Sequence, residues 1–214
     1  MRKVIADEWL TLDGVIQAPG QPDEDTSGGF QHGGWHMGYL DDLALRRVAD
    51  SVIKAGGFLL GRRTYEIFAA HWPNASEEEQ VLAEPLNSKP KYVASRTLAE
   101  PLAWQNSTVL QGDVADAVAA LKREDGEDLH VIGSSQLVQT LVERDLVDEF
   151  RVMIDPVVVG GGKRLFHDDG VRRPLRLVDS QVTTTGVIVA TYASAKGEPA
   201  SPGRSSTSAP GGGP

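Results

Sequence analysis

Apolar and polar positions along the chain switch repeatedly between the spacing of strands and the spacing of helices. Short runs rich in β-branched and large apolar residues predict strands at 3–10, 58–60, 92–94, 108–110 and 129–132, with a brief resumption at 15–16. Apolar residues three and four apart predict helices that begin near Met37 and that cover 62–71, 113–121 and 134–142. Another helix begins after Ser76, which forms a capping box with Glu79. Gly56-Gly57 and Gly126 are expected to end the helices before them.

The C-terminal third of the body has a different pattern. A long apolar strand is expected over 149–159, and a hairpin joins 175–182 to 187–192 around Thr184-Thr185-Gly186. This order predicts an α/β fold of three layers, helices on both faces of a mostly parallel twisted sheet that ends in an antiparallel hairpin. The folded domain is assigned to 1–195. The segment 196–214, KGEPASPGRSSTSAPGGGP, has no large apolar residue and is expected to be disordered.

Composition narrows the class of function. The chain has 214 residues, 21 basic and 30 acidic, for a formal charge of −9. A nucleic-acid or anionic-membrane surface needs clustered Lys and Arg, so neither partner is expected. There are no cysteines, which excludes disulfides, thiolate catalysis and cysteine-ligated metals. No signal-peptide core follows Met1, and no apolar run approaches the roughly 20 residues that span a bilayer, so a cytoplasmic protein is expected.

The sequence does not match the common motifs for phosphate, dinucleotide or metal binding. The run 159–164 has three glycines and a lysine, but Val157 and Arg164 stand where a phosphate loop requires Gly and Ser or Thr. The same glycines do not form a dinucleotide fingerprint, because Leu165 takes the place of the last glycine. His32 and His36 lie four apart in the glycine-rich loop 18–36, but no third ligand accompanies them, so no metal site is predicted.

Two strand-to-helix junctions are suited to anions. The first is Gly61-Arg62-Arg63-Thr64 after the strand 58–60, and the second is Gly133-Ser134-Ser135-Gln136-Leu137 after the strand 129–132. Free N–H groups at a helix start bind phosphate, and a glycine lets the backbone approach it. Ser95 and Arg96 end a third strand and could hold a further phosphate, such as the 2′-phosphate of NADP. The alternatives are solvated surface arginines and ordinary N-capping by serine.

Five motifs in order resemble a known family. They are Thr11-Leu12-Asp13-Gly14-Val15-Ile16, Leu60-Gly61-Arg62-Arg63-Thr64-Tyr65-Glu66, Val131-Ile132-Gly133-Ser134-Ser135, Leu146-Val147-Asp148-Glu149-Phe150 and the segment 156–166. The chain resembles the dihydrofolate-reductase-like superfamily over 3–193. Within it, the chain is most similar to the reductase domain of riboflavin-biosynthesis deaminase–reductases and its stand-alone relatives.

The resemblance implies a reductase that uses NADPH to reduce a ring C=N, an imine or a carbonyl. It places Gly61, Arg62, Arg63 and Thr64 at the cofactor phosphates, and Ser95 and Arg96 at the 2′-phosphate. It further places the run Gly133 to Leu137 at the pyrophosphate. Gly14, Val15 and Ile16 would lie near the nicotinamide, with Trp35 closing over it from the loop 18–36.

Departures from the family concern the substrate. Riboflavin-pathway reductases carry an Asp and a Glu at two positions that look equivalent to Phe68 and Ile132 of this chain. Because both acids help to hold a phosphoribosylamino-pyrimidine, the two replacements put that substrate in doubt. Asp42 is the nearest analogue of the carboxylate that dihydrofolate reductases place on their first helix, although an Asp at a helix start also simply offsets the dipole.

Two functions are therefore open. One is an NADPH-dependent reductase of pterin-like or riboflavin-precursor-like small molecules, of the 5-amino-6-(5-phosphoribosylamino)uracil reductase type. The other is a nucleotide-binding module without catalysis, because no proton donor is unambiguous. A homodimer is expected, since the hairpin leaves an apolar sheet edge that a second copy would cover. The alternative is that the first helix and its loop cover this edge in the monomer.

Overall fold

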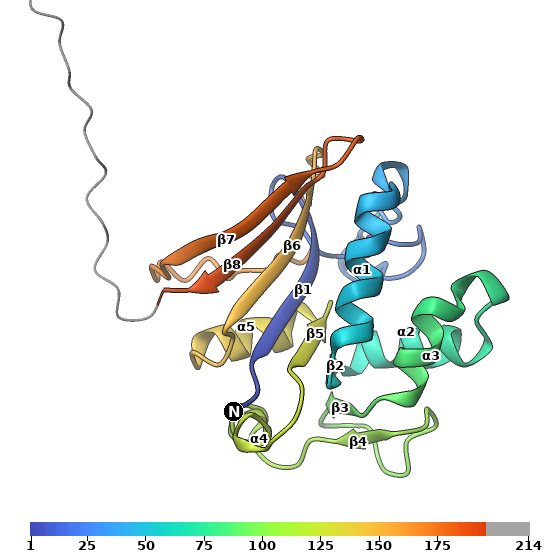
Figure 1. Cartoon of the computed structure of the whole chain (residues 1–214), viewed down its shortest axis with the longest axis vertical. Helices are drawn as coiled ribbons and strands as arrows, with labels where there is room; N and C mark the ends of the chain where they lie inside the picture. Colours follow the sequence, from blue (N-terminus) through green and yellow to red (C-terminus); the bar gives the residue numbers. More distant parts are fainter. Residues whose placement is uncertain (196–214) are drawn as a thin grey trace, which may run out of the picture.

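One eight-stranded sheet organises the computed structural model, which describes residues 1–195 (Figure 1). The expected disordered tail, 196–214, lies outside the described residues. The strands are β1 (Val4–Thr11), β2 (Gly57–Gly61), β3 (Lys91–Ala94), β4 (Ser107–Val109), β5 (Leu129–Ile132), β6 (Glu149–Asp155), β7 (Leu175–Val182) and β8 (Ile188–Ser194). The helices are α1 (Asp42–Lys54), α2 (Arg62–His71), α3 (Gln80–Ser88), α4 (Val114–Arg123) and α5 (Ser135–Glu143). Short 3-10 turns occupy Ser27–Gly29, Met37–Tyr39, Trp72–Asn74 and Glu77–Glu79.

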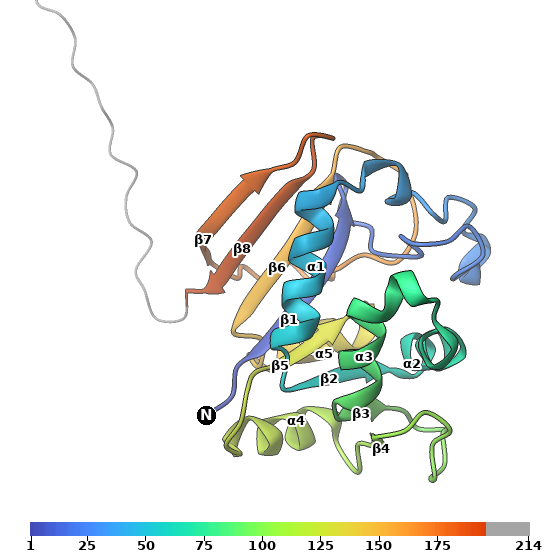
Figure 2. The same ribbon diagram turned by 45° about the vertical axis from the view of Figure 1, so that its right-hand side comes forward.

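The strand order is β4-β3-β2-β5-β1-β6-β8-β7. All neighbouring pairs from β4 to β6 are parallel, whereas β8 runs antiparallel to both β6 and β7. Figures 1 and 2 show the C-terminal hairpin at one margin of the sheet. The predicted three-layer α/β fold with a terminal antiparallel hairpin is confirmed.

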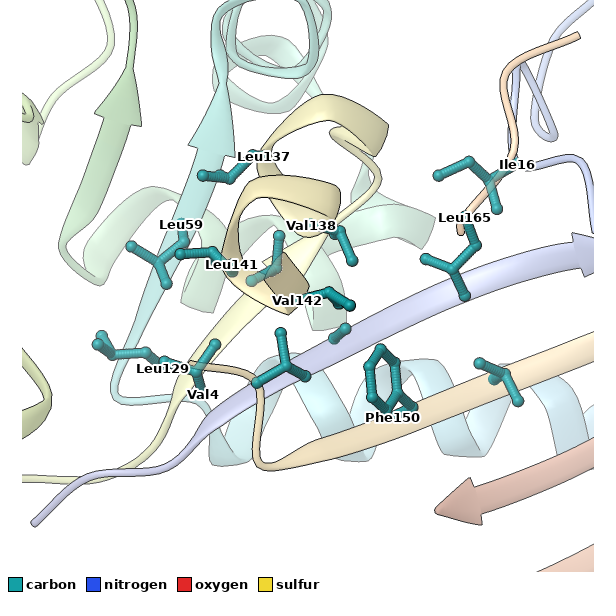
Figure 3. Packing of buried hydrophobic residues seen from close by; sticks show 14 of the residues in the cluster. Val4, Ile16, Leu59, Leu129, Leu137, Val138, Leu141, Val142, Phe150 and Leu165 are labelled. Carbon is teal, nitrogen blue, oxygen red and sulfur yellow. The ribbon is translucent and has the colours of Figure 1, made fainter. Parts of the chain in front are cut away.

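Alternation along β2 explains the two helical layers. Leu59 packs on the face that α4 and α5 cover, in one large cluster that also contains Val118. Figure 3 shows Leu59 beside Leu141 of α5 in this cluster. Phe58 and Leu60 point to the opposite face and pack in a second cluster with side chains of α1, α2 and α3. Since successive side chains of a strand face opposite sides, a strand buried on both faces carries apolar residues at every position instead of alternating apolar and polar ones.

The helix expected from Met37 is two separate elements. A 3-10 turn covers Met37–Tyr39, the chain is then extended, and α1 begins at Asp42. Asp41 caps α1 by accepting a hydrogen bond from the N–H of Ala44 (2.9 Å). The helix ends before the glycine pair. Gly56 instead permits close approach, because a Cβ there would lie 2.4 Å from the carbonyl oxygen of Glu127.

Further elements differ from the sequence prediction in extent or in type. The strand expected over 149–159 ends at Asp155, because Pro156 cannot continue the hydrogen-bonded ladder. The brief strand expected at 15–16 is a single bridge between Val15 and Arg164. Helix α4 ends at Arg123, three residues before Gly126. The capping box of Ser76 is present, but it opens a 3-10 turn that leads into α3.

The loop 18–36 is tied to the sheet at its far end. His36 and Asp155 are fully buried, and their Nδ1 and Oδ2 atoms lie 2.7 Å apart. The ring of His36 also stacks on Trp9 of β1, with centroids 3.9 Å apart. Burial raises the pKa of Asp155, although the hydrogen bond with His36 opposes the rise. In residues 1–195, no helix is long and apolar enough to cross a membrane.

Candidate active site

A cleft of about 1760 Å³ lies against the carboxyl ends of the parallel strands and continues along α1. In open α/β sheets, ligands bind at this edge. Most of the residues that the sequence assigned to a cofactor line this cleft. They are Ile16, Gly61, Arg62, Arg63, Thr64, Ser95, Arg96, Gly133, Ser134, Ser135, Gln136 and Leu137. The structure therefore brings together segments that are more than 70 positions apart in the chain.

The β2–α2 turn at Gly61 and the β5–α5 turn at Gly133 contact each other directly. Ser134 Oγ accepts a hydrogen bond from the N–H of Gly61 (2.9 Å) and lies 2.9 Å from Thr64 Oγ1. A Cβ at Gly61 would lie 3.3 Å from Ser134, and one at Gly133 would lie 3.4 Å from Thr64 Oγ1. Gly133 also has a φ of +55°, which a side chain rarely adopts. A side chain at either turn would therefore press on the other turn, and the positive φ of Gly133 favours glycine there in addition.

Ser134 does not cap α5 in the ordinary way. Its backbone is left-handed, with φ of 65°, and its side chain makes no cap hydrogen bond. The N-capping alternative for Ser134 is therefore wrong, because its hydroxyl is committed to the β2–α2 turn. The first N–H groups of α5 have no acceptor within the helix and lie where the cleft is lined by Ser135 and Gln136.

The two arginines of the first junction have different partners. Arg62 is half exposed, donates to Thr97 Oγ1 (3.2 Å) and lies 3.8 Å from a carboxylate oxygen of Glu66. Arg63 Nε lies 3.0 Å from Asp25 Oδ1, and Asp25 also pairs with Lys163. Burial raises the pKa of Asp25, but hydrogen bonds from Lys163 and Ser27 outweigh burial and lower it overall. Arg63 therefore also fastens the loop 18–36 to α2.

Ser95 and Arg96 extend the cleft beyond β3. Ser95 Oγ accepts hydrogen bonds from the N–H groups of Thr97 (3.2 Å) and Leu98 (3.0 Å), so it caps its own turn. Among residues 1–195, Arg96 takes part in no hydrogen bond or ion pair to another side chain. Its charge is therefore available to an anionic ligand.

Four residues assigned to the site from sequence do not line the cleft. Val15 is fully buried, and Gly14 makes the turn that Arg164 closes. The indole N–H of Trp35 donates to the carbonyl of Gln17 (2.8 Å), and its ring packs within the loop cluster. Asp42 is exposed at the first position of α1. The structure therefore does not bring these four residues to the cleft, and their assignment to the nicotinamide and the substrate stays a prediction.

Polar groups that sequence reasoning missed lie in the centre of the sheet. Asp7 of β1 accepts from Ser51 of α1 (2.7 Å) and lies 2.6 Å from His130 Nδ1 of β5. Ser51 Oγ and His130 Nδ1 are 3.0 Å apart, which completes a closed set of three. Asp7 and Ser51 both line the cleft. The available signal was the pair Asp7-Glu8 in the middle of a strand covered on both faces, where acids are anomalous.

Glu8 points to the other side of β1. It is 4 % exposed, lines the cleft, and its Oε1 atom has no hydrogen-bond partner among the described residues. Burial raises the pKa of Glu8 well above its usual range, and the charge of Asp7 adds to the rise. A hydrogen bond from the N–H of Gly133 opposes both effects without cancelling them.

The residues present fit a dinucleotide phosphate. The glycine turns at Gly61 and Gly133 both line the cleft, the start of α5 offers N–H donors, and Arg62 and Arg96 supply charge. No group of three or more His, Cys, Asp and Glu within 1–195 could hold a metal ion.

Comparison with known proteins shows which family the chain resembles along most of its length. The family model described as the RibD C-terminal domain matches residues 2–189. Two Bacillus subtilis (strain 168) proteins are similar along most of the chain. YyaP is 32% identical over 200 residues, which is 89% of this chain and 94% of that protein. YwjB is 30% identical over 178 residues, 82% of this chain and 89% of that protein.

Two solved structures share the fold. A putative riboflavin biosynthesis protein from Shewanella sp. PV-4 superposes with a TM-score of 0.63 at 20% identity, covering 90% of this chain and 98% of that one. A pyrimidine reductase-like protein from Corynebacterium diphtheriae superposes with a TM-score of 0.57 at 12% identity, covering 90% and 92%.

Proposed function

The chain belongs to the RibD C-terminal domain family, and we propose that it is an NADPH-dependent reductase that transfers hydride to a small heterocyclic, imine or carbonyl substrate. Membership of this family supports a reductase of the riboflavin-pathway type. The observation that carries the proposal is the convergence of Gly61–Thr64, Arg96 and Gly133–Leu137 on one cleft. Phosphate-binding turns and an unpaired arginine in one space are what a dinucleotide with a 2′-phosphate requires.

The other half of the cleft would take the substrate. It is lined by Trp9, Val48 and Ser51 on one side and by Phe68 and Trp72 on the other. Phe68 meets Trp72 edge to face, with centroids 5.9 Å apart. An aromatic and aliphatic wall of this kind favours a flat ring over a phosphorylated sugar chain. One structural neighbour is named a pyrimidine reductase-like protein, so pyrimidines and pterins are the first substrates to examine.

The protein's contribution to such a reaction would be binding, orientation and exclusion of water. When bound, NADPH supplies the hydride. Loop 18–36 lines the cleft through residues 18–21 and 23–25, and the contacts of Asp25 with Arg63 and Lys163 hold it in place. Asp42, exposed outside the cleft, is not needed for this role.

The active species is proposed to be a homodimer that pairs along β7. Every residue of β7 is exposed, and Leu177 and Val178 are 51 % and 52 % exposed. No other described strand pairs with the outer edge of β7. Exposed apolar edges of this kind associate, most often with twofold symmetry.

A binding titration followed by turnover tests the proposed function. NADPH is expected to bind with higher affinity than NADH, and its absorbance band is expected to disappear with a pterin, an aminopyrimidine or a small carbonyl. Tight NADPH binding without turnover on any of these would instead favour a nucleotide-binding module without catalysis. Absence of NADPH binding would overturn both.

A further inference from the structure

We infer that the Asp7 carboxylate is a specificity-determining group of the cleft, which selects a flat heterocycle that offers it an N–H donor. The inference rests on the proposed function, because it names the chemistry of the substrate that the same cleft would take. It starts from a charged side chain in the wall of the substrate half. Asp7 and Trp9 lie on the same face of β1, and both line the cleft together with Ser51 of α1.

Two donors from different elements hold the Asp7 carboxylate in place. Ser51 Oγ donates to Oδ1 (2.7 Å), and His130 Nδ1 lies 2.6 Å from Oδ2. Because a carboxylate only accepts hydrogen bonds, His130 must carry a hydrogen on Nδ1. The carboxylate therefore has one fixed orientation before any ligand arrives, as a pre-organised binding group requires.

The two donors occupy one edge of the carboxylate. Ser51 Oγ and His130 Nδ1 are only 3.0 Å apart, although they contact different oxygens. Each carboxylate oxygen can accept about two hydrogen bonds, so each keeps capacity on its outer side. No other hydrogen bond to Asp7 is present among residues 1–195. The remaining capacity suits a single N–H group at one oxygen, and not a pair of adjacent donors that clamps both oxygens.

Burial decides which member of the set can touch a ligand. The side chain of His130 is 2 % exposed and does not line the cleft, whereas that of Asp7 is 16 % exposed and does. His130 therefore acts through Asp7, as a positioning residue. Asp7 also pairs in register with Ile132, directly before the turn at Gly133. A ligand that binds Asp7 would thus lie beside the turn proposed to hold the cofactor.

Neighbouring cations leave the charge of Asp7 uncompensated. Arg151 is its register partner on β6, but Arg151 Nε donates to Glu149 Oε1 (2.8 Å). Within the described residues, no lysine or arginine forms an ion pair with Asp7. A negative acceptor in a wall that also contains Trp9 and Phe68 favours N–H donors and disfavours carbonyl edges and phosphates. A flat ring with an N–H at its edge suits both the aromatic side chains and the carboxylate.

The same contacts also fasten α1 to the sheet, and this purely structural role predicts a different result. A fastening role affects stability alone. A recognition role changes the relative affinity of two ligands that differ by one hydrogen-bond donor. The experiment therefore compares two such ligands on each variant.

The first measurement uses 2-aminoquinazoline and 2-methylquinazoline, which have nearly the same shape and differ in whether the 2-substituent donates a hydrogen bond. Isothermal titration calorimetry is run on the wild-type protein, both free and with NADP+, which cannot reduce the probes. The amino probe is expected to bind about tenfold or more tightly than the methyl probe, the scale of a hydrogen bond to a charged group. Equal affinity, or binding of neither probe, would overturn the inference.

Variants then assign the preference to Asp7. Asp7→Asn should reduce the preference for the amino probe to about threefold or less, because the charge is lost and one acceptor becomes a donor. Ser51→Ala leaves the carboxylate in place and should reduce the preference by a smaller factor. Asp116→Asn removes the same charge from an exposed position of α4 outside the cleft and should leave the preference unchanged.

Thermal unfolding of each variant separates recognition from fastening. An Asp7→Asn variant that is less stable but keeps the full preference would show that Asp7 only fastens α1, and would overturn the inference. If Asp7→Asn does not fold, the wild-type preference and its reduction in Ser51→Ala decide instead.

The outcomes also separate the inference from the proposed function. If the wild type binds NADPH and reduces a substrate but does not distinguish the two probes, the role of Asp7 is overturned and the reductase stands. If the wild type does not bind NADPH, the reductase is overturned, and the titrations of the free protein alone report whether Asp7 selects an N–H donor.

Discussion

Strands β2 and β7 belong to the same sheet but have opposite environments. The apolar residues of β2 are all at most 1 % exposed, because α1 to α3 cover one face and α4 and α5 the other. Every residue of β7 is exposed, although this strand also carries several large apolar side chains. Position in the sheet, and not apolar content, decides which strand is buried.

The contrast also separates the functions of the two regions. Parallel strands covered on both faces bring their carboxyl ends to one edge, where the glycine turns meet. The hairpin contributes backbone pairing to β6 and an open outer edge. Ligand binding is therefore expected in the first region and self-association in the second.

The largest effect is expected from truncation of the buried strand. Leu59→Ala should lower the free energy of unfolding by about 2–5 kcal/mol, because it leaves a cavity in the core. Leu177→Ala on β7 should change the stability of the monomer by about 0.5 kcal/mol or less. Urea unfolding of both variants measures the difference. Equal costs would contradict the comparison.

The second largest effect is expected at the ligand-binding edge of the sheet, where Arg96 is proposed to bind the 2′-phosphate of NADPH. Arg96→Ala should weaken NADPH by about 1.5–3 kcal/mol, the range for a hydrogen bond to a charged group, and leave NADH unaffected. Arg176→Ala removes the same charge from β7 and serves as the control. Isothermal titration calorimetry measures the affinity of each variant for NADPH and NADH. Equal losses of affinity for the two cofactors would contradict the assignment of Arg96 to the 2′-phosphate.

The third effect concerns the open edge. Leu177→Lys should weaken self-association about tenfold or more, roughly 1.4 kcal/mol, because a charge would be desolvated in the interface. Val81→Lys places the same charge on an exposed position of α3 and should leave the mass unchanged. Light scattering over a concentration series measures both. A wild type that stays at 23.0 kDa on concentration would exclude the dimer.

The smallest effect is expected at the link between the regions. Thr184 of the hairpin turn donates to Asp41 Oδ2 through its N–H and its hydroxyl, each at 2.8 Å. Hydrogen bonds from the N–H groups of Ala44 and Thr184 lower the pKa of Asp41. A lowered pKa gives stability that is present above the usual aspartate pKa and is lost as pH falls through the folded value. Thr184→Val should reduce that acid-dependent loss, as measured by thermal unfolding at a series of pH values.

Much of the ligand edge could be predicted from sequence because it is encoded locally. A strand, a glycine and a helix start occur within a few residues at Gly61 and at Gly133, so these turns were predicted at the correct places. Asp7, Ser51 and His130 come from three distant segments, and only pairing of β1 with β5 brings them together. Gly14, Val15 and Trp35 were assigned by resemblance. Their contacts show that they pack the loops, which no local pattern distinguishes from ligand binding.

The order of the strands has a consequence for synthesis. Strand β1 is made first but lies in the middle of the sheet, between β5 and β6, whose residues are about 125 to 145 positions further along. During translation β1 therefore has no sheet partner until β5, which ends at Ile132, has been made, and β2 likewise waits for β5 on one side. Such long-range pairing folds slowly and leaves apolar strands exposed on the nascent chain. Overexpressed protein is thus most vulnerable to aggregation before residue 155 emerges, and chaperone binding to nascent chains should decline after that point.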